Sequence, residues 1–436
     1  MAQSFEEMVE DTLKRLRGGE PPAEQPLPPL PSTPSAPGAP GAPPETVPQF
    51  IPVEPGPRPY TPPKIDPPPD SAPPTSPPPA AATPAPSAEV GAAPAAAASP
   101  DAAIAPSAAT AGAAPGTTPG VELPADPLAE RTRESLTPEE VNAAIFPDVL
   151  EEIRGASPLV LKAQALLDRA GASPGAIDAY QGSNLSKAVA AVETVLGLPI
   201  DGVLDREVWD AIGGDNAPAV LVQYTITPED LAYPFVPTIP ADYAEQAKLP
   251  SLGYMGPGEM FGERFHMDSK LLRALNPTED FSKAGTPIWV TAVESTPIVL
   301  KVAHIVVDKG QRQVRAYDAA DHLIVAYPAT IGSPDNPSPT GEHVVKAVAP
   351  DPVYYYDPAN FVQGANTEKL QLPPGPNSPV GSVWIDLSDP GYGIHGTPEP
   401  TRVDKTGSHG CVRLTNWDAE ELASLVAPGT TVSFTE

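Results

Sequence analysis

The side chains best suited to chemistry lie in two short segments near the C-terminus, 395–397 with the sequence His-Gly-Thr and 408–413 with the sequence Ser-His-Gly-Cys-Val-Arg. Cys411 is the only cysteine of the chain, so it cannot form an internal disulfide. An imidazole within hydrogen-bond reach can accept the thiol proton and leave a thiolate that attacks an acyl carbon. His395 and His409 are the two candidate bases.

The residues around Cys411 also favour acyl transfer. Cys411 follows His409 by two positions, and on a strand such residues point to the same face. Gly410 allows the backbone to lie close to a substrate, and the amides of Gly410 and Cys411 can stabilise a developing oxyanion. The carbonyl of Gly396 is the group available to orient the ring of His395.

Two other interpretations of Cys411 remain open. Together with His395 and His409 it could supply three ligands of a zinc site, although the paired ligand spacing typical of such sites is missing. It could also be a small buried apolar residue. The flanking Ser-His-Gly sequence favours the nucleophile.

Composition excludes several classes of function. The chain has 436 residues, a net charge of −29 and a pI near 4.4, which disfavours binding to nucleic acids and to anionic membranes. No apolar run is long enough to cross a bilayer, and the N-terminus lacks the pattern of a secretory signal.

The N-terminal third does not have the composition of a folded domain. Residues 1–19 carry apolar side chains at helical spacing, which predicts a short amphipathic helix. Residues 20–136 are rich in Pro and Ala and cannot bury enough apolar surface to fold, so they are expected to form a disordered, extended linker.

Residues 137–214 are expected to form a small all-α domain. Apolar residues recur at helical spacing from Leu159 to Ala170, and a second apolar stripe follows a cap at Ser183 or Asn184. Asp205 can cap a third helix. The sequence of this region, including Gly-Leu-Pro-Ile-Asp-Gly at 197–202, resembles the helical peptidoglycan-binding domain.

After a connector at 215–249, residues 250–292 form a second small module. The pair Gly258-Glu259, the helix-like run around Leu271 and the strand-like Ile288-Trp289-Val290 resemble a degenerate LysM repeat. That family has a strand-helix-helix-strand fold of the α+β class and binds amino-sugar chains.

From 301 to 434 the pattern changes to short β-branched runs separated by turns. Three antiparallel strands are expected at 303–307, 314–317 and 323–327, followed by long loops rich in Pro and Gly. The chain is therefore expected to be multidomain, with a C-terminal domain that is mainly β.

This last region resembles the L,D-transpeptidase catalytic domain, the YkuD family. The signature lies in the segments 395–397 and 408–413. Upstream, the run Pro-Thr-Gly-Glu at 339–342 resembles a turn of the family, and 372–381 with Trp384-Ile385 resembles its ErfK/YbiS-like branch.

The resemblance implies that Cys411 attacks the carbonyl of the third residue of a peptidoglycan stem peptide and releases the terminal D-alanine. It implies His395 as the base, oriented by the Gly396 carbonyl, without a metal or cofactor. The residues implied to form the oxyanion site and pocket are Ser408, His409 and Gly410. The residues expected to bind substrate are Arg413, Tyr354, Tyr356 and Trp384.

The implied partners are peptidoglycan stem peptides and glycan, with no nucleic acid and no transmembrane segment. The acyl acceptor is either the amine of another diamino acid, which gives a three-to-three crosslink, or a lysine of an envelope lipoprotein. A substrate of this kind implies the periplasm or cell envelope. Two alternatives stay open, a cysteine hydrolase or L,D-carboxypeptidase that uses water, and a non-catalytic scaffold that binds the wall.

Overall fold

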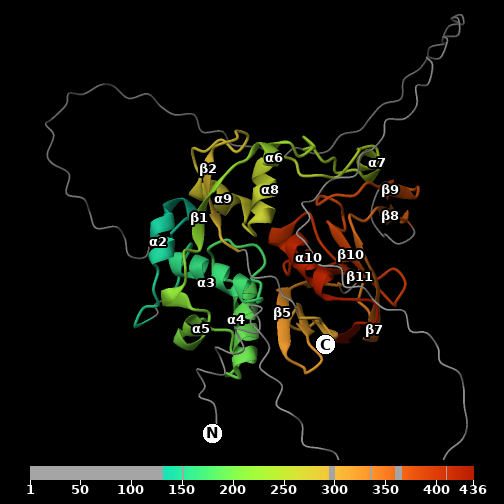
Figure 1. The fold of residues 1–436 in the computed structure, drawn as a ribbon. Coiled ribbons are helices and arrows are strands. Elements are labelled where there is room, and N and C mark those ends of the chain that lie inside the picture. Colours follow the sequence, from blue (N-terminus) through green and yellow to red (C-terminus); the bar gives the residue numbers. More distant parts are fainter. Residues whose placement is uncertain (1–130, 150–151, 294–299, 334–335, 359–365, 409) are drawn as a thin grey trace, which may run out of the picture. The chain divides into compact units, whose positions relative to one another are not determined.

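The computed structural model describes residues 131–149, 152–293, 300–333, 336–358, 366–408 and 410–436. The helix expected at 1–19 and most of the linker expected at 20–136 lie outside the described residues. All described residues belong to one unit, in which helices precede a large sheet (Figure 1).

A helical module begins the described part of the chain, and it starts at residues 133–135, inside the segment 20–136 expected to be a disordered linker. Its elements are η1 (Arg133–Ser135), α2 (Pro138–Ala143), α3 (Pro158–Arg169), α4 (Ser183–Leu196), α5 (Arg206–Ala211) and η2 (Gly214–Asn216). The Asp205 side chain caps α5, as predicted. The cap of α4 is Gly182 rather than Ser183 or Asn184, because the Ser183 hydroxyl donates instead to Asp404 Oδ2, at 3.0 Å.

A second module is built on a two-stranded antiparallel sheet. Its elements are β1 (Leu221–Thr225), α6 (Pro228–Leu231), α7 (Tyr243–Gln246), α8 (Pro257–Arg264), α9 (Ser269–Leu275) and β2 (Pro287–Thr291). The strand that pairs with β2 lies at 221–225, inside the expected connector 215–249 and not at the start of 250–292. We call this part, residues 221–291, the β1–β2 module. Its likeness to LysM stays a prediction.

The C-terminal domain is organised around one long mixed sheet. Its strand order is β5-β4-β3-β13-β7-β10-β11-β12-β6. These strands are β3 (His304–Asp308), β4 (Gln313–Tyr317), β5 (Leu323–Pro328), β6 (Thr330–Ile331), β7 (Gly341–Pro350), β10 (Val383–Leu387), β11 (Gly393–His395), β12 (Val412–Arg413) and β13 (Thr431–Thr435). The three antiparallel strands expected after 301 are β3, β4 and β5.

The remaining elements of this domain lie beside the sheet. They are the hairpin of β8 (Tyr354–Tyr356) and β9 (Leu370–Leu372), the short helix η4 (Pro400–Arg402) and the helix α10 (Asn416–Leu425). α10 packs against β10 and β11, the strands that carry Trp384 and His395 (Figure 1).

The helical module and the β1–β2 module share a single apolar core. That core also includes Leu323 and Ala326 of β5, whereas a separate cluster fills the catalytic domain. Two backbone hydrogen bonds of 2.9 Å lie at the same place. The amide of Ala326 donates to the carbonyl of Gly171, and the amide of Ser173 donates to the carbonyl of Ala326. The loop after α3 thus covers the edge of the sheet at β5, and α4 packs beside it (Figure 1).

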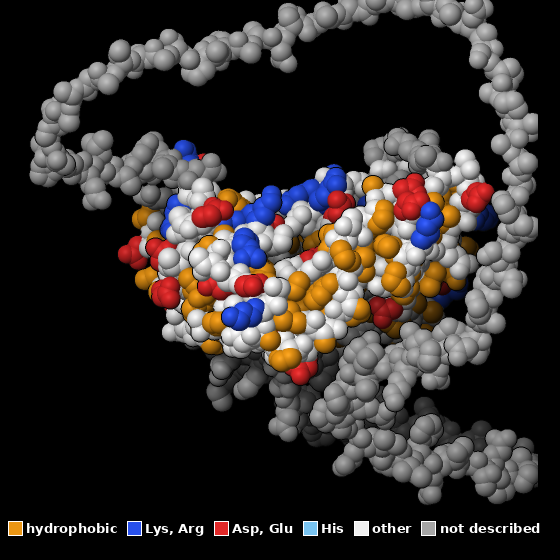
Figure 2. Space-filling view, turned by 90° about the horizontal axis from the view of Figure 1, so that it is seen from above, with side chains coloured by type: hydrophobic (Ala, Val, Ile, Leu, Met, Phe, Trp, Pro, Cys, Tyr) orange, Lys and Arg blue, Asp and Glu red, His pale blue; other side chains and the backbone are white. Residues whose placement is uncertain are grey.

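The surface is mixed in charge where it can be seen. In Figure 2, Lys and Arg side chains are interspersed with acidic and apolar ones on the face shown. Among the described residues no helix is long and apolar enough to cross a membrane.

A candidate active site around Cys411 and His395

The parallel strands β11 and β12 bring the predicted catalytic residues together. His395 lies opposite Arg413 in this pair, and Ile394 lies opposite Val412. Cys411 stands just before β12, and its sulfur contacts the backbone of Gly393 on the neighbouring strand. Residues two apart on a strand share a face, so Cys411 and Arg413 lie on the same side of the sheet as His395.

His395 is buried, with 3% of its surface exposed, and its ring is held by one strong contact. Nδ1 lies 2.7 Å from the carbonyl oxygen of Gly396. A carbonyl can only accept, so Nδ1 carries the proton and Nε2 keeps its lone pair. Burial, together with the charge of Arg413, lowers the pKa of His395 to about 3, so the imidazole is neutral at neutral pH and can act as a base.

Cys411 is partly exposed, and it is a protonated thiol at rest. Burial raises its pKa, while the backbone of Gly393 and the charge of Arg413 lower it to a smaller extent. The sulfur lies 3.8 Å from the carbonyl oxygen of Gly391, and the thiol donates a hydrogen bond to this oxygen. The resting site therefore holds a neutral thiol and a neutral imidazole on neighbouring strands, without a preformed thiolate.

Two serine hydroxyls fix the backbone on either side of the sulfur. Ser338 Oγ donates to the carbonyl of Gly410 at 2.7 Å, and Ser408 Oγ donates to the carbonyl of Cys411 at 2.5 Å. Since the peptide bond is planar and trans, the Cys411 N–H points away from Ser338. Gly410 has φ +101°, and a Cβ there would lie 2.7 Å from the ring of Tyr392. The sequence therefore needs glycine at this position. His409 lies outside the described residues.

The residues expected to bind substrate lie around this centre. Trp384 is the cross-strand neighbour of His395, and their rings stack with centroids 5.4 Å apart. The Arg413 Nε atom is buried and has no hydrogen-bond partner among the described residues. Its guanidinium is a cation close enough to the Cys411 sulfur to lower the pKa of that thiol.

Tyr354 and Tyr356, two of three consecutive tyrosines, differ in their surroundings. Tyr354 lies near enough to Cys411 that the two groups interact electrostatically, and burial raises its pKa. Tyr356 is only 5% exposed and packs in a small cluster with Leu252 and Leu372. Tyr243 of α7 contacts both rings edge-on, with centroids 6.2 Å from Tyr354 and 5.3 Å from Tyr356.

Three residues of this neighbourhood were missed by the sequence analysis. Ser338 precedes the Pro-Thr-Gly-Glu turn at 339–342, a signal that marks the segment but not the contact of its hydroxyl. Tyr243 comes from the stretch expected as a connector. Asn416 packs against Gly396, and nothing local in the sequence indicates this contact. Among the described residues no cluster of three His, Cys, Asp or Glu side chains could hold a metal ion.

Two family models match the chain. Residues 302–433 match the L,D-transpeptidase catalytic domain, YkuD, and residues 156–212 match the model described as "Putative peptidoglycan binding domain". The first match contains Cys411, His395 and every strand of the long sheet except the last two residues of β13.

Curated relatives of this chain carry the same description. It is 34% identical over 131 residues to a protein of Bacillus licheniformis named "Putative L,D-transpeptidase YkuD", and 31% identical over 130 residues to its namesake in Bacillus subtilis. Each match covers 30% of this chain and 64% of the relative, so the chain spans slightly less than two thirds of either relative's length.

A solved structure of L,D-transpeptidase 3 from Mycobacterium tuberculosis, in complex with a faropenem-derived adduct, is 17% identical. The match covers 34% of this chain and 66% of that one, with a TM-score of 0.27, which is too low to support a conclusion. The two family matches identify an L,D-transpeptidase catalytic domain, YkuD, at residues 302–433, preceded by a match to the putative peptidoglycan binding domain at residues 156–212, and the curated relatives carry the L,D-transpeptidase description as well.

Proposed function

We propose that this protein is a peptidoglycan L,D-transpeptidase in which Cys411 is the nucleophile and His395 the general base. One observation carries the proposal. A neutral imidazole, with Nδ1 tied to the Gly396 carbonyl, lies on the strand next to the only cysteine of a YkuD domain. Such an imidazole has its free lone pair on Nε2, which is what proton abstraction from a thiol requires.

In the first half-reaction the sulfur attacks the carbonyl carbon of the third stem-peptide residue as its proton passes to His395 Nε2. A C–S bond forms, and the oxyanion is stabilised by the amides near Gly410 and Cys411. The C–N bond to the terminal D-alanine then breaks. The proton on His395 passes to the leaving amine, so that D-alanine departs neutral at nitrogen and a thioester remains on Cys411.

In the second half-reaction an acceptor amine attacks the thioester. His395 takes a proton from that amine, an amide C–N bond forms and the C–S bond breaks. The proton then returns to the sulfur, which restores the thiol. The acceptor amine belongs to the side chain of a second diamino acid, which gives a three-to-three crosslink, or to a lysine of an envelope protein.

The surrounding side chains have complementary roles in binding. The guanidinium of Arg413 would pair with a carboxylate of the donor peptide, since its buried Nε has no other partner among the described residues. Ser408 and Ser338 would keep the oxyanion amides in place. Tyr354 and Trp384 would form the walls of the donor site, with Tyr356 packed behind them.

The position of the substrate sets where the protein acts. Peptidoglycan lies outside the cytoplasmic membrane, so we place the enzyme in the periplasm or cell envelope. The domain at 156–212 would hold the catalytic domain on the wall, and the β1–β2 module would add a second contact with glycan.

The products formed from purified disaccharide-tetrapeptide fragments test this function. We expect crosslinked dimers and free D-alanine, measured by liquid chromatography with mass spectrometry, and their loss in Cys411→Ala and His395→Ala. His322→Ala is the matched control, since the side chain of His322 is 64% exposed and pairs with Asp318 on a surface turn. Trimmed monomers without dimers would indicate the hydrolase, and an unchanged substrate would indicate the scaffold.

A further inference from the structure

The first turn of α10 lies directly behind the catalytic histidine. The amide of Leu414, just before this turn, donates to the carbonyl of His395 at 2.9 Å. Asn416 is 2% exposed, and a Cβ built on Gly396 would lie 2.1 Å from its Oδ1. A Cβ on Gly381 would meet the same oxygen at 2.1 Å. Because there is no free space on this side, the position of Asn416 determines the position of Gly396. The carbonyl of Gly396 in turn accepts the hydrogen bond from His395 Nδ1.

Asn416 is in turn held by a residue of the β1–β2 module. Its Nδ2 donates to Glu263 Oε2 at 2.9 Å and to the carbonyl of Pro376 at 3.2 Å, while its Oδ1 accepts from the amide of Ser382 at 3.2 Å. Glu263 lies on α8, is 8% exposed and also accepts from the hydroxyl of Tyr254 at 3.3 Å. Both ends of the Asn416 amide are therefore committed, so its orientation is fixed.

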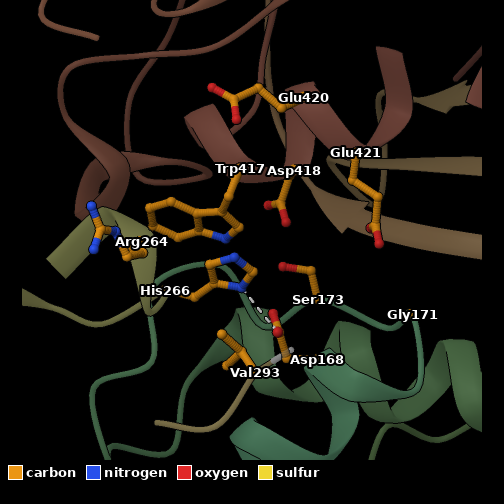
Figure 3. Close-up of a pocket in the computed structure, with 10 residues that line it drawn as sticks. All are labelled: Asp168, Gly171, Ser173, Arg264, His266, Val293, Trp417, Asp418, Glu420 and Glu421. Atoms are coloured by element: carbon orange, nitrogen blue, oxygen red, sulfur yellow. Dashed lines mark hydrogen bonds and ion pairs between the residues drawn. The ribbon is translucent and has the colours of Figure 1, made fainter. Parts of the chain in front are cut away.

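The next residues of the same turn also contact the accessory modules. Trp417 stacks on His266 with ring centroids 5.0 Å apart and an interplanar angle of 10°, and His266 Nδ1 lies 2.9 Å from Asp168 Oδ2 of α3. Figure 3 shows this stack at the wall of a cavity of about 310 Å³, with Asp418 pointing in from α10. The hydrogen bond between Glu263 and Asn416 is thus one of several contacts that join α10 to the accessory modules.

From these contacts we propose that Glu263 is a positioning residue for His395, acting across the domain boundary through Asn416 and Gly396. The β1–β2 module then sets the geometry of the catalytic base, in addition to any role in binding the wall. The inference rests on the proposed function, because it is there that His395 acts as the base.

The test compares Glu263→Ala and Glu263→Gln with the matched control Glu193→Ala. Glu193 is also a buried acid of an accessory helix, 2% exposed, but its Oε2 accepts from the amides of Asp201 and Gly202, far along the chain from any contact with α10. Burial raises the pKa of both Glu263 and Glu193. The readouts are the rate of Cys411 acylation by a carbapenem, the thermal midpoint, and the ¹H–¹⁵N spectrum of the His395 ring.

We expect Glu263→Ala to acylate about 10- to 100-fold more slowly, the loss typical of a catalytic group displaced by a fraction of an ångström or more. Its His395 Nδ1–H signal should shift or broaden as the contact with Gly396 loosens. Glu263→Gln keeps an acceptor for Asn416 and should recover most of the rate. Glu193→Ala should lower the thermal midpoint and leave both the rate and the His395 signal unchanged.

Two results would overturn the proposal. One is a folded Glu263→Ala variant with the wild-type rate and His395 signal, and the other is an equal loss in Glu193→Ala. If the wild-type chain is not acylated at all, the proposed function fails by itself. The ring signal of His395 is read without turnover, so it still decides whether Glu263 positions the ring.

Discussion

Cys411 and His395 do not form an ion pair in the resting protein, because both side chains are neutral. Burial raises the pKa of the Cys411 thiol and lowers that of His395, and the charge of Arg413 opposes the first effect but adds to the second. Both groups are consequently neutral at rest. In the mechanism we propose, proton transfer from sulfur to nitrogen therefore takes place during the attack on the substrate and is coupled to C–S bond formation.

This neutral pair predicts a particular pH dependence for alkylation of Cys411 by iodoacetamide. Since only the thiolate reacts, the rate should rise about tenfold per pH unit from weakly acidic to weakly alkaline solution. The measurement is loss of free thiol with time at each pH, in the wild-type chain. A rate that stays level across neutral pH would instead reveal an ion pair with His395.

Gly396 gives a second prediction for a single residue. A methyl group there would meet Asn416 Oδ1 at 2.1 Å and displace the carbonyl that holds His395. Gly396→Ala should therefore slow carbapenem acylation by about a hundredfold or more. Gly182→Ala is the control, because Gly182 has an extended backbone with φ −163° and open space where its Cβ would be. Equal rates in the two variants would contradict the packing described here.

Among the elements, α4 and the loop after η4 are joined by a buried charge. Lys187 Nζ lies 2.8 Å from Asp404 Oδ2, and burial lowers the pKa of Lys187 while Asp404 opposes this effect. Ser183 donates to the same carboxylate at 3.0 Å. The helical module is thereby tied to the segment between the neighbouring strands β11 and β12.

Removal of this carboxylate should destabilise the protein strongly. Asp404→Ala leaves the Lys187 ammonium buried without its partner, which typically costs about 3 kcal/mol. Asp210→Ala is the control, since Asp210 is 54% exposed in its pair with Arg206 and should cost less than about 1 kcal/mol. Urea unfolding measures the free energy of unfolding of both variants. Equal decreases in the two variants would show that the buried pair contributes no more to stability than the exposed pair.

Local patterns in the sequence predicted the elements better than their contacts. The strands β3 to β5 and the helices α3 and α5 follow from periodicity and from caps such as Asp205, which act within a few residues. The strand β1 was missed because its partner β2 lies more than sixty residues later. The capping role of Ser183 was wrong because a residue far along the chain, Asp404, takes its hydroxyl.

The same distinction holds for the site. The signature around Cys411 and His395 could be recognised from neighbouring residues alone, and so could the Gly396 carbonyl. The roles of Ser338 and Asn416 could not, because both depend on tertiary contacts that no local pattern encodes.

For the whole molecule, the junction between α10 and the accessory modules takes up protons on folding. Burial raises the pKa of Glu263 to about 8 and that of Asp418 to about 7, above their ordinary values of 4.5 and 3.8. The groups that face Glu263 are Asn416, Tyr254, Glu259 and Glu420, and those that face Asp418 are Asp168, His266, Ser173 and Thr415. Both acids are more protonated in the folded state than in the unfolded one.

The sign of the stability change follows. The stabilisation from these protonated acids is complete below the unfolded pKa values and is lost as pH rises through about 7 and about 8. Urea midpoints of the wild-type chain should therefore fall across this window. The double variant Glu263→Gln with Asp418→Asn, which cannot titrate at these positions, should show a flatter profile. Parallel profiles for the two proteins would contradict the proton uptake.

The most direct test of the central claim is the intact mass of the protein after incubation with a carbapenem, followed by peptide mapping. We expect the wild-type chain to gain the mass of one carbapenem on the peptide that contains Cys411, and Cys411→Ala to gain none. An unmodified wild-type chain with its thiol reduced, or an adduct that persists in Cys411→Ala, would contradict the role of Cys411 as the nucleophile.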